Sequence, residues 1–404
     1  MSRRPSHPPH PLVLVISTLG YGGTQRQVVE LANHIDPARF DAHICSLSDY
    51  VPLADRITDR DRRLHIIEKK WKYDVTVIPR LAKLLAQLKA DIVQGYLFDA
   101  EIASRLAGRI ARTPMVFGSE RSSDYELKRR QRITYRLTRG CMDMLIANSE
   151  AGAQFDCRLF GYQPWQCRVI YNGVDTERFR PADEQALRRD IGIRDGEYVV
   201  GMFASFWKPK NHRMFFTAAR GVLDRFPQTR LLLVGDDLYE GIQGSNEYKA
   251  DMARLVDELG IGGRCLFMGN RDDVERLYCL CDLTVLPSLF EGVPNVALES
   301  MACGIPVIVT EISDNARIVL DGRVGCVIPP GNEVALCESI CRLLADGERR
   351  RQMGREARVW VESEFSMSRM ADKTARVYQE ALGDLNGAPD NRQTAPGQAG
   401  RTDA

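Results

Sequence analysis

The sequence predicts an α/β protein with two consecutive doubly wound domains, each built on a mainly parallel sheet. Short apolar, β-branched runs alternate with helix-period segments along the chain, which is the pattern of βαβ units. This alternation stops at a polar stretch near residues 172–196 and then starts again. The 404 residues, 44% of them hydrophobic, suffice for two separate cores. The composition excludes disordered, collagen-like and disulfide-stapled classes.

Seven strands are expected in the first half, because each candidate is a short, mostly apolar run. They are residues 12–17, 42–47, 64–67, 91–96, 114–117, 144–148 and 168–171. Apolar residues at helical spacing predict helices between them, most clearly at 24–35 and 77–88. The second half repeats this order, with strands at 198–203, 230–234, 264–268, 283–286 and 306–309 and helices at 212–226 and 248–259.

The junction is expected where Asn172-Gly173 forms a turn and a polar stretch opens at Pro181. We therefore predict a first domain over residues 11–180 and a second domain over 181–365. A break at Ser366 precedes a helical pattern at 367–382, so segment 366–383 is expected to cross back to the first domain. Residues 1–10 and 384–404 are polar and rich in proline or glycine, which predicts two disordered tails.

The charge is divided unevenly between the halves. Residues 1–180 carry 28 basic and 20 acidic side chains, a net +8, and the remainder carries 27 and 34, a net −7. Such asymmetry points to a membrane or polyanion near the basic half. Its densest part interleaves basic and apolar residues, so it predicts either an amphipathic helix on anionic lipid or a solvated helix face. The basic residues are Lys128, Arg129, Arg130, Arg132, Arg136 and Arg139.

No apolar run reaches the roughly 18 residues that a membrane span needs. The eleven cysteines are scattered, without the close pairs of a zinc or disulfide framework. We therefore expect a cytoplasmic protein, peripheral at the inner face of the cell membrane. No recognition module for nucleic acid accompanies the basic segment, so nucleic acid is not an expected partner.

Two short loops at the ends of strands have residues suited to phosphate. Gly22-Gly23-Thr24 follows the first strand and opens a helix, whose N-terminal amides favour an anion. A structural turn in which Thr24 caps the helix is an equal alternative. Lys208-Pro209-Lys210 follows residues 198–203, where a cation could neutralise a diphosphate. A solvated turn is the alternative, and His212 is expected to start a helix.

The most informative segment is residues 290–307, which predicts a loop, a short helix and the next strand. Glu291 lies in the loop, whereas Asn295 and Glu299 are four residues apart on one helical face. The backbone amides of Gly292, Val293, Pro294 and Asn295 surround the helix start, although Pro294 has no N–H to offer. Two carboxylates beside amide donors form a site that accepts hydrogen bonds from sugar hydroxyls.

This segment resembles the signature of the large family-4 glycosyltransferases, in which E-x7-E precedes S-M-A-x-G-x-P-V-I-V. That family contains retaining enzymes of the GT-B fold, with two facing Rossmann-like domains and a cleft between them. Further matches lie at 148–150, 169–179, 231–236, 267–270 and 325–331, so the resemblance covers roughly residues 11–383.

The resemblance implies that a UDP- or GDP-linked sugar binds mainly to the second domain. Glu299 would hold the ribose, Glu291 the transferred sugar and Lys210 the diphosphate. The backbone at Gly269, Asn270 and Arg271 would hold the base, while Gly22 and Gly23 would close over the phosphates. Lys210 and Glu291 are the expected catalytic residues, and neither a metal nor another cofactor is implied.

Two positions depart from the family pattern. Ser205 stands where an arginine is usual, five residues before Lys210, and the stretch around Glu120 and Arg121 lacks the usual histidine. Glu120 and Arg121 are expected on the acceptor side instead.

The expected reaction transfers a hexosyl group with retention to a glycan or lipid-linked glycan hydroxyl, in surface polysaccharide synthesis. The alternatives are a catalytically silent partner of another transferase and a GT-B nucleotide-sugar epimerase. A phosphorylase would need a cofactor-lysine context that the chain does not show.

Overall fold

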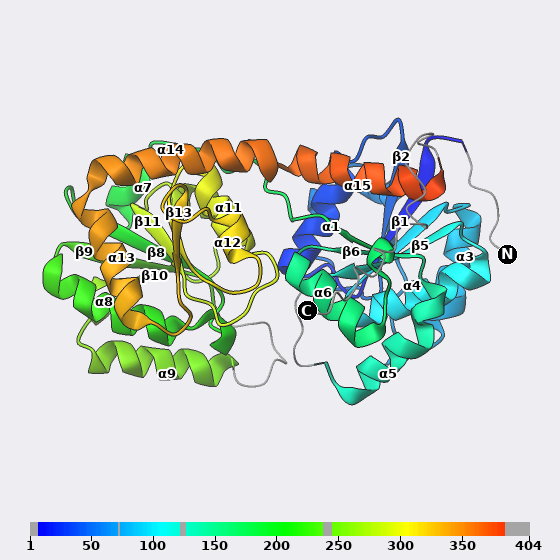
Figure 1. Ribbon diagram of the computed structural model, residues 1–404, viewed down its shortest axis with the longest axis horizontal. Helices are drawn as coiled ribbons and strands as arrows, with labels where there is room; N and C mark the ends of the chain where they lie inside the picture. Colours follow the sequence, from blue (N-terminus) through cyan, green and yellow to red (C-terminus); the bar gives the residue numbers. More distant parts are fainter. Residues whose placement is uncertain (1–6, 72, 122–126, 237–244, 384–404) are drawn as a thin grey trace, which may run out of the picture.

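The computed structural model describes residues 7–71, 73–121, 127–236 and 245–383. Two α/β lobes lie side by side, one built from the first half of the chain together with its last helix and the other from the rest of the second half (Figure 1). The predicted tail at 384–404 lies outside the described residues. Of the predicted tail at 1–10, residues 1–6 lie outside the described residues, whereas His10 begins the first strand and is buried, so it does not belong to a disordered tail. Its imidazole Nδ1 lies 2.8 Å from Asp91 Oδ2.

The first domain contains a seven-stranded sheet in the order β3-β2-β1-β4-β5-β6-β7, and all of its neighbouring strands are parallel. The order reverses direction between β1 and β4, as in a doubly wound fold. The strands are β1 (His10–Ile16), β2 (Phe40–Ser46), β3 (Leu64–Ile66), β4 (Ile92–Tyr96), β5 (Met115–Glu120), β6 (Met144–Ala147) and β7 (Cys167–Val169).

The second domain has a six-stranded parallel sheet in the order β10-β9-β8-β11-β12-β13. Its strands are β8 (Tyr198–Phe203), β9 (Thr229–Val234), β10 (Cys265–Phe267), β11 (Leu283–Leu286), β12 (Val307–Thr310) and β13 (Gly325–Ile328). The strand analysis did not predict β13, because a four-residue run opening with glycine carries little strand signal.

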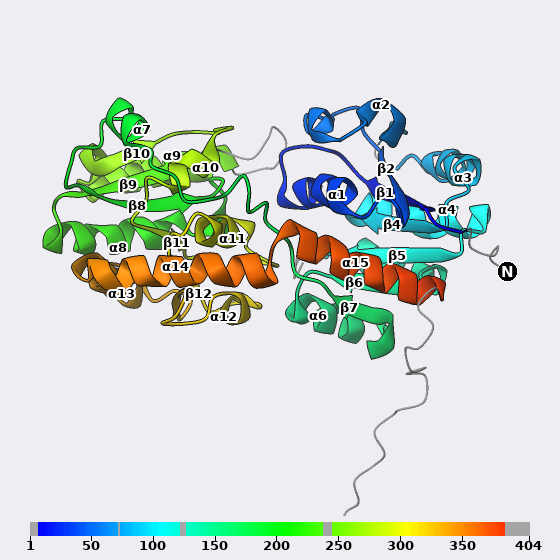
Figure 2. The ribbon, with the colours of Figure 1, turned by 90° about the horizontal axis from the view of Figure 1, so that it is seen from above.

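Helices cover both faces of each sheet, as βαβ crossovers require (Figure 2). In the first domain they are α1 (Gly23–His34), α2 (Arg60–Arg63), α3 (Val77–Gln87), α4 (Phe98–Ala111), α5 (Arg129–Thr138) and α6 (Glu150–Phe160). In the second they are α7 (Gln185–Asp190), α8 (His212–Arg225), α9 (Ser245–Glu258), α10 (Val274–Tyr278), α11 (Asn295–Ala302), α12 (Asn315–Ile318), α13 (Glu333–Ala345) and α14 (Gly347–Glu364).

Alternation along the strands divides the core of each domain into two layers. In β1, Leu12 and Leu14 pack with α1, whereas Val13 and Val15 pack with α3 and α4. In β8, Val199 belongs to the layer under α11 and α14, and Val200 to the layer under α8 and α13. Each sheet is therefore buried on both sides, which explains its near-continuous apolar strands.

The last helix, α15 (Met367–Leu382), returns to the first domain, end to end with α14 (Figures 1 and 2). Ser366 caps it by accepting a hydrogen bond from the Arg369 amide. The Tyr378 ring packs edge-on against Phe40 and Phe117 at 5.6 and 5.1 Å, so the helix completes the first core. The two crossings of the chain lie together, since Val174 pairs with Ser366 in a parallel bridge.

Candidate active site

The carboxyl ends of the two sheets meet at the domain boundary. Gly23, at the start of α1, lies so close to Asn295 that a Cβ on the glycine would be 2.8 Å from the Asn295 Nδ2. Asn295 Oδ1 in turn accepts a hydrogen bond of 2.8 Å from Asn172 Nδ2. A Cβ on Gly292 would lie 2.7 Å from the backbone oxygen of Arg121. The start of α1 and the start of α11 therefore face one another across the boundary.

Lys210 and Glu291 form an ion pair on the second domain's side of this boundary. Lys210 Nζ donates to Glu291 Oε1 at 2.6 Å, and the same oxygen accepts a hydrogen bond of 2.7 Å from Ser288 Oγ. Lys210 ends a 3-10 turn, after which Asn211 adopts φ +56° and α8 begins. The loops carrying the two residues are joined by a backbone hydrogen bond of 2.8 Å from Leu289 to Pro209.

Glu299 is buried one turn into α11, with 8% of its surface exposed. Its Oε2 accepts a hydrogen bond of 2.9 Å from the Tyr278 hydroxyl. Its Oε1 lies 3.7 Å from Nη1 of Arg26, which extends across the boundary from α1. Burial raises the pKa of the Glu299 carboxyl, and the positive charge of Arg26 opposes that rise. Each carboxylate of the predicted pair therefore has its own cation, and one of these belongs to the other domain.

The loops proposed for the base and the diphosphate follow β10 and β8. Gly269 has φ +61°, and its carbonyl accepts a hydrogen bond of 2.9 Å from the Gly235 amide. The Arg271 guanidinium is engaged by both carboxylate oxygens of Asp273, at 2.8 and 2.7 Å. Asn270 is exposed beside it. Ser205 is half-buried after β8 and brings no charge. Val293 and Pro294 are buried, and Val293 packs in the core under α11, so any ligand contact of Val293 would be through its backbone amide.

His212 serves as the start of α8, as predicted. Its ring stacks on Phe206 at 4.3 Å and is 1% exposed. Burial lowers the pKa of this imidazole to about 3, so it is neutral near pH 7. A neutral, stacked histidine fixes the loop that carries Lys210.

Arg121 lies at the boundary between the domains. Its Nη1 donates to Asn172 Oδ1 at 3.1 Å, and its guanidinium carbon lies 5.1 Å from the centre of the Tyr96 ring. Glu120, at the end of β5, lies beside Gly152 of α6. It shares a hydrogen bond with Asp156, whose pKa burial raises to about 8. The two residues expected on the acceptor side are therefore adjacent to the boundary contacts.

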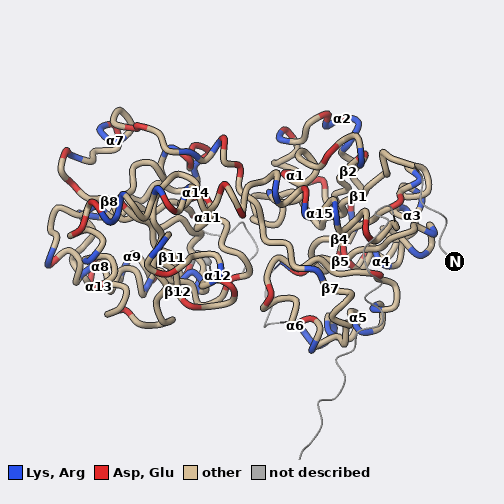
Figure 3. The backbone as a smooth tube through the Cα atoms, turned by 45° about the horizontal axis from the view of Figure 1, so that its top comes forward, with Lys and Arg blue, Asp and Glu red and all other residues tan. Residues whose placement is uncertain are grey.

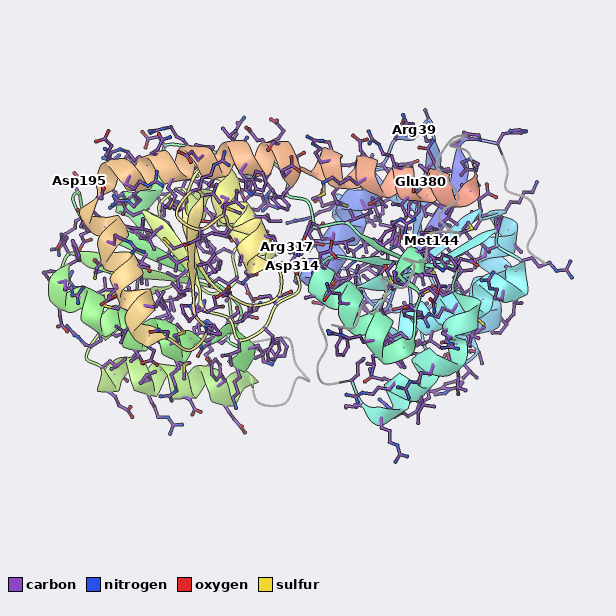
Figure 4. All side chains as sticks on the ribbon, in the orientation of Figure 1. Arg39, Met144, Asp195, Asp314, Arg317 and Glu380 are labelled. Atoms are coloured by element: carbon purple, nitrogen blue, oxygen red, sulfur yellow. The ribbon has the colours of Figure 1, made fainter. Side chains whose placement is uncertain are left out.

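Asp314 makes a contact that the sequence did not suggest. It lies after β12, in the second domain, and faces the first (Figure 4). Its carboxylate accepts hydrogen bonds from the Glu150 and Ala151 amides at 2.6 and 3.2 Å, and from the Tyr171 hydroxyl at 2.8 Å. A carboxylate suits the positive end of α6. The predicted element order could not reveal this, because the partner residues are more than 140 positions away.

The basic segment forms α5, on the rim of the first domain (Figures 1 and 3). All six predicted basic side chains are exposed, as are Ile133 and Leu137, the latter at 80%. Tyr135 and Leu127 instead face inward. Arg136 donates to the Leu159 carbonyl, and Arg130 to the Tyr73 hydroxyl. The helix is therefore amphipathic, with an outer face that mixes charge and apolar surface.

Comparison with known proteins gives matches to two family models. The description "Glycosyltransferase Family 4" matches residues 21–178, and "Glycosyl transferases group 1" matches residues 183–360. Together these matches cover well over half of the 404 residues. The chain belongs to the glycosyltransferases.

Curated relatives of this glycosyltransferase include an Escherichia coli enzyme named UDP-Gal:alpha-D-GlcNAc-diphosphoundecaprenol alpha-1,3-galactosyltransferase. It is 26% identical over 372 residues, which cover 88% of this chain and 93% of the relative. A D-inositol 3-phosphate glycosyltransferase of Mycobacterium tuberculosis is 32% identical over 251 residues, which cover 60% of this chain and 50% of that enzyme. The chain thus spans about half the length of the second relative.

Solved structures show the same fold. Anabaena Alr3699/HepE in complex with UDP superposes with a TM-score of 0.81 at 20% identity, covering 93% of this chain and 100% of that one. WaaG, a glycosyltransferase of lipopolysaccharide biosynthesis, gives 0.69 at 17% identity over 91% and 99%. The two parallel-sheet domains are therefore those of a GT-B glycosyltransferase. Within the described ranges no helix combines the length and apolar character of a membrane span.

Proposed function

We propose that this glycosyltransferase transfers a hexosyl group, with retention, from a UDP- or GDP-linked sugar to a hydroxyl of a lipid-linked glycan. The observation that carries the proposal is the arrangement of Lys210, Glu291 and Glu299 around the start of α11, facing the start of α1. Carboxylates accept hydrogen bonds from sugar and ribose hydroxyls, while a lysine and two helix N-termini favour a diphosphate.

In the proposed complex, the ion pair between Lys210 and Glu291 opens, and each of the two side chains contacts the donor instead. The hydroxyls of the transferred sugar donate to Glu291, and the lysine is released to the diphosphate. Glu299 accepts from the ribose hydroxyls, and the Gly269–Arg271 backbone holds the base. Breaking the glycosidic bond leaves charge on the diphosphate, so a preorganised cation there lowers the barrier. We propose that Lys210 and the helix termini supply this stabilisation without a metal or another cofactor.

Arg26 is proposed as the cation that replaces the arginine expected at position 205. It comes from the first turn of α1, whose start faces Asn295. Its distance of 3.7 Å from Glu299 is longer than a hydrogen bond, and its buried Nε has no hydrogen-bond partner among the described residues. A guanidinium held this loosely can turn toward a phosphate next to the ribose.

The acceptor is proposed to be a lipid-linked glycan in surface polysaccharide synthesis. The name of the Escherichia coli relative specifies a diphosphoundecaprenol-linked acceptor. The outer face of α5 suits an anionic bilayer, because exposed arginines flank Ile133 and Leu137. We propose a peripheral position at the cytoplasmic side of the membrane. Flotation with anionic liposomes tests this: binding at low salt that is lost in 1 M salt is expected, and failure to bind at low salt contradicts it.

An assay with a panel of UDP- and GDP-sugars tests the proposed reaction. Slow release of nucleotide without acceptor, and faster release with a short-chain lipid-diphosphate glycan, are expected. Proton NMR of the product then reports whether the anomeric configuration is retained. Nucleotide binding without turnover would favour the silent-partner alternative, and a changed sugar still attached to nucleotide would favour an epimerase.

A further inference from the structure

A hollow of about 320 Å³ opens at the carboxyl edge of the first sheet, where β1, β2 and β3 end. It is separate from the residues assigned to the donor. Ligands of open α/β sheets bind beyond this edge, and small-molecule sites begin at about 300 Å³. Its lining includes Ser17, Thr18, Asp49, Glu68, Lys69 and Trp71.

The lining has the chemistry of a saccharide site. The Trp71 side chain is 55% exposed and offers a flat apolar surface against the C–H face of a sugar ring. Asp49 and Glu68 are exposed carboxylates that accept hydrogen bonds from hydroxyls. Ser17 and Thr18 add hydroxyl groups. A pyranose has an apolar C–H face and hydroxyl groups around the edge of its ring. The aromatic side chain matches that face, and the carboxylates beside it can accept hydrogen bonds from those hydroxyls.

The local charge argues against a phosphate in the same hollow. Among the lining residues that the structure describes, Lys69 is the one cation, and it is paired with Asp99 at 2.5 Å, so the carboxylates of Asp49 and Glu68 outnumber the cations within this described set. An anionic ligand would be repelled, whereas an uncharged, hydroxyl-rich ligand would not.

The hollow also lies beside the site proposed for the donor. The Leu19 amide and the Thr18 hydroxyl both donate to the Tyr50 carbonyl, at 3.3 and 3.0 Å, so the ends of β1 and β2 form one wall. From Thr18 the same loop continues to Gly22, four residues away and hence within about 14 Å. Gly23 follows and contacts Asn295. A ligand in the hollow is thus adjacent to the loop that the donor phosphates would meet.

We propose that this hollow binds an uncharged pyranose ring of the glycan acceptor, stacked on Trp71 and hydrogen-bonded to Asp49 and Glu68. The inference rests on the proposed function, since it identifies the acceptor subsite of that reaction. Tyr73, two residues after Trp71, accepts a hydrogen bond from Arg130 of α5, and the centre of its ring lies 5.2 Å from that guanidinium, so α5 contacts the chain segment that follows the lining. The remainder of the acceptor extends from the hollow along this surface.

Binding of methyl glycosides tests the site without requiring turnover. Saturation-transfer NMR with methyl N-acetylglucosaminide, galactoside and glucoside is expected to detect binding of at least one of them to the full chain. Trp71→Ala should abolish the signal, Trp71→Phe should keep part of it, and Asp49→Asn should weaken it several-fold. Trp165→Ala is the matched control, because Trp165 is similarly exposed at 49% in the same domain. Its signal should equal that of the wild type.

Kinetics provide a second measurement. Trp71→Ala should lower kcat/KM for the short-chain lipid-diphosphate glycan at least tenfold, while acceptor-independent release of nucleotide reports on folding and on the donor site. No glycoside binding by the wild type, or equal binding by Trp71→Ala, would overturn the inference. Failure of the proposed function is distinguishable, because it would remove nucleotide-sugar turnover and leave the glycoside signal and its dependence on Trp71 in place.

Discussion

Replacing Arg26 by alanine is the most informative test of the donor site. The change removes the cation that lies 3.7 Å from Glu299 and is supplied by the opposite domain. A charge-assisted hydrogen bond contributes about 1.5–3 kcal/mol, which is about 10- to 150-fold in affinity. Since 39% of the Arg26 side chain is exposed, solvent screening favours the lower end. We therefore expect UDP to bind Arg26→Ala about tenfold more weakly.

The assay compares UDP with uridine by calorimetry. If Arg26 turns toward the phosphates, UDP loses affinity while uridine changes less than about twofold. The measurement belongs at pH 8, because loss of Arg26 allows the pKa of buried Glu299 to rise further, and this carboxyl must stay ionised to accept from ribose. Arg39→Ala is the control, since Arg39 is a first-domain arginine far from the boundary (Figure 4).

A rescue variant tests whether the positive charge of Arg26 matters for UDP binding more than its place on α1. Ser205→Arg in the Arg26→Ala background should restore most of the UDP affinity, because it returns a cation to the position that the family pattern predicts. Equal losses for uridine and UDP would refute the phosphate role and leave Arg26 as a residue that positions Glu299. Unchanged UDP binding in Arg26→Ala would remove it from the donor site altogether.

Three further predictions concern the residues of the candidate site and its supports. Lys210→Ala and Glu291→Ala should each lower transfer by about 10²- to 10³-fold while the thermal transition is retained, and near-normal turnover in either variant would exclude that residue. Asp314→Ala should destabilise the packed domains by about 0.5–2 kcal/mol and enlarge the radius of gyration in X-ray scattering, and an unchanged profile would contradict the capping role. His212 has a pKa lowered to about 3, so the unfolded chain takes up its proton first and stability should fall from about pH 6.5 toward pH 3. His212→Phe should flatten this part of the pH profile in chemical denaturation, and an equal slope in both proteins would show that other groups cause it.

Strand periodicity and loop composition predicted most of the fold. Both β8 and β11 begin and end where the apolar runs do, and α15 occupies the predicted residues 367–382. Elements held by tertiary contacts were missed: β13 is too short to stand out, and His10 joins β1 because it reaches Asp91 of a later segment. The local sequence pattern does not indicate contacts between residues that are far apart in the chain.

Within the candidate site, the sequence predicted the residues but not their partners. Glu299 follows from the family resemblance, whereas its ion pair with Arg26 depends on how two separately folded domains pack. Asp314 sits in an ordinary loop sequence, and only the position of α6 makes it a cap. Arg121 was predicted to lie on the acceptor side, but its hydrogen bond to Asn172 could not be predicted, because that contact forms only where the two domains meet.

The paired crossings at Val174 and Ser366 have a consequence for the kinetics of the enzyme. Val174 donates to the Phe365 carbonyl at 2.8 Å and accepts from the Met367 amide at 3.0 Å, so the two connections are joined at one place. Two lobes joined there can separate mainly by rotation about that point. Such a rotation would break the Asp314 and Asn172 contacts in the same movement. Release of the spent nucleotide would then be a single hinge step, and the hydrogen bonds between the two lobes would set its rate.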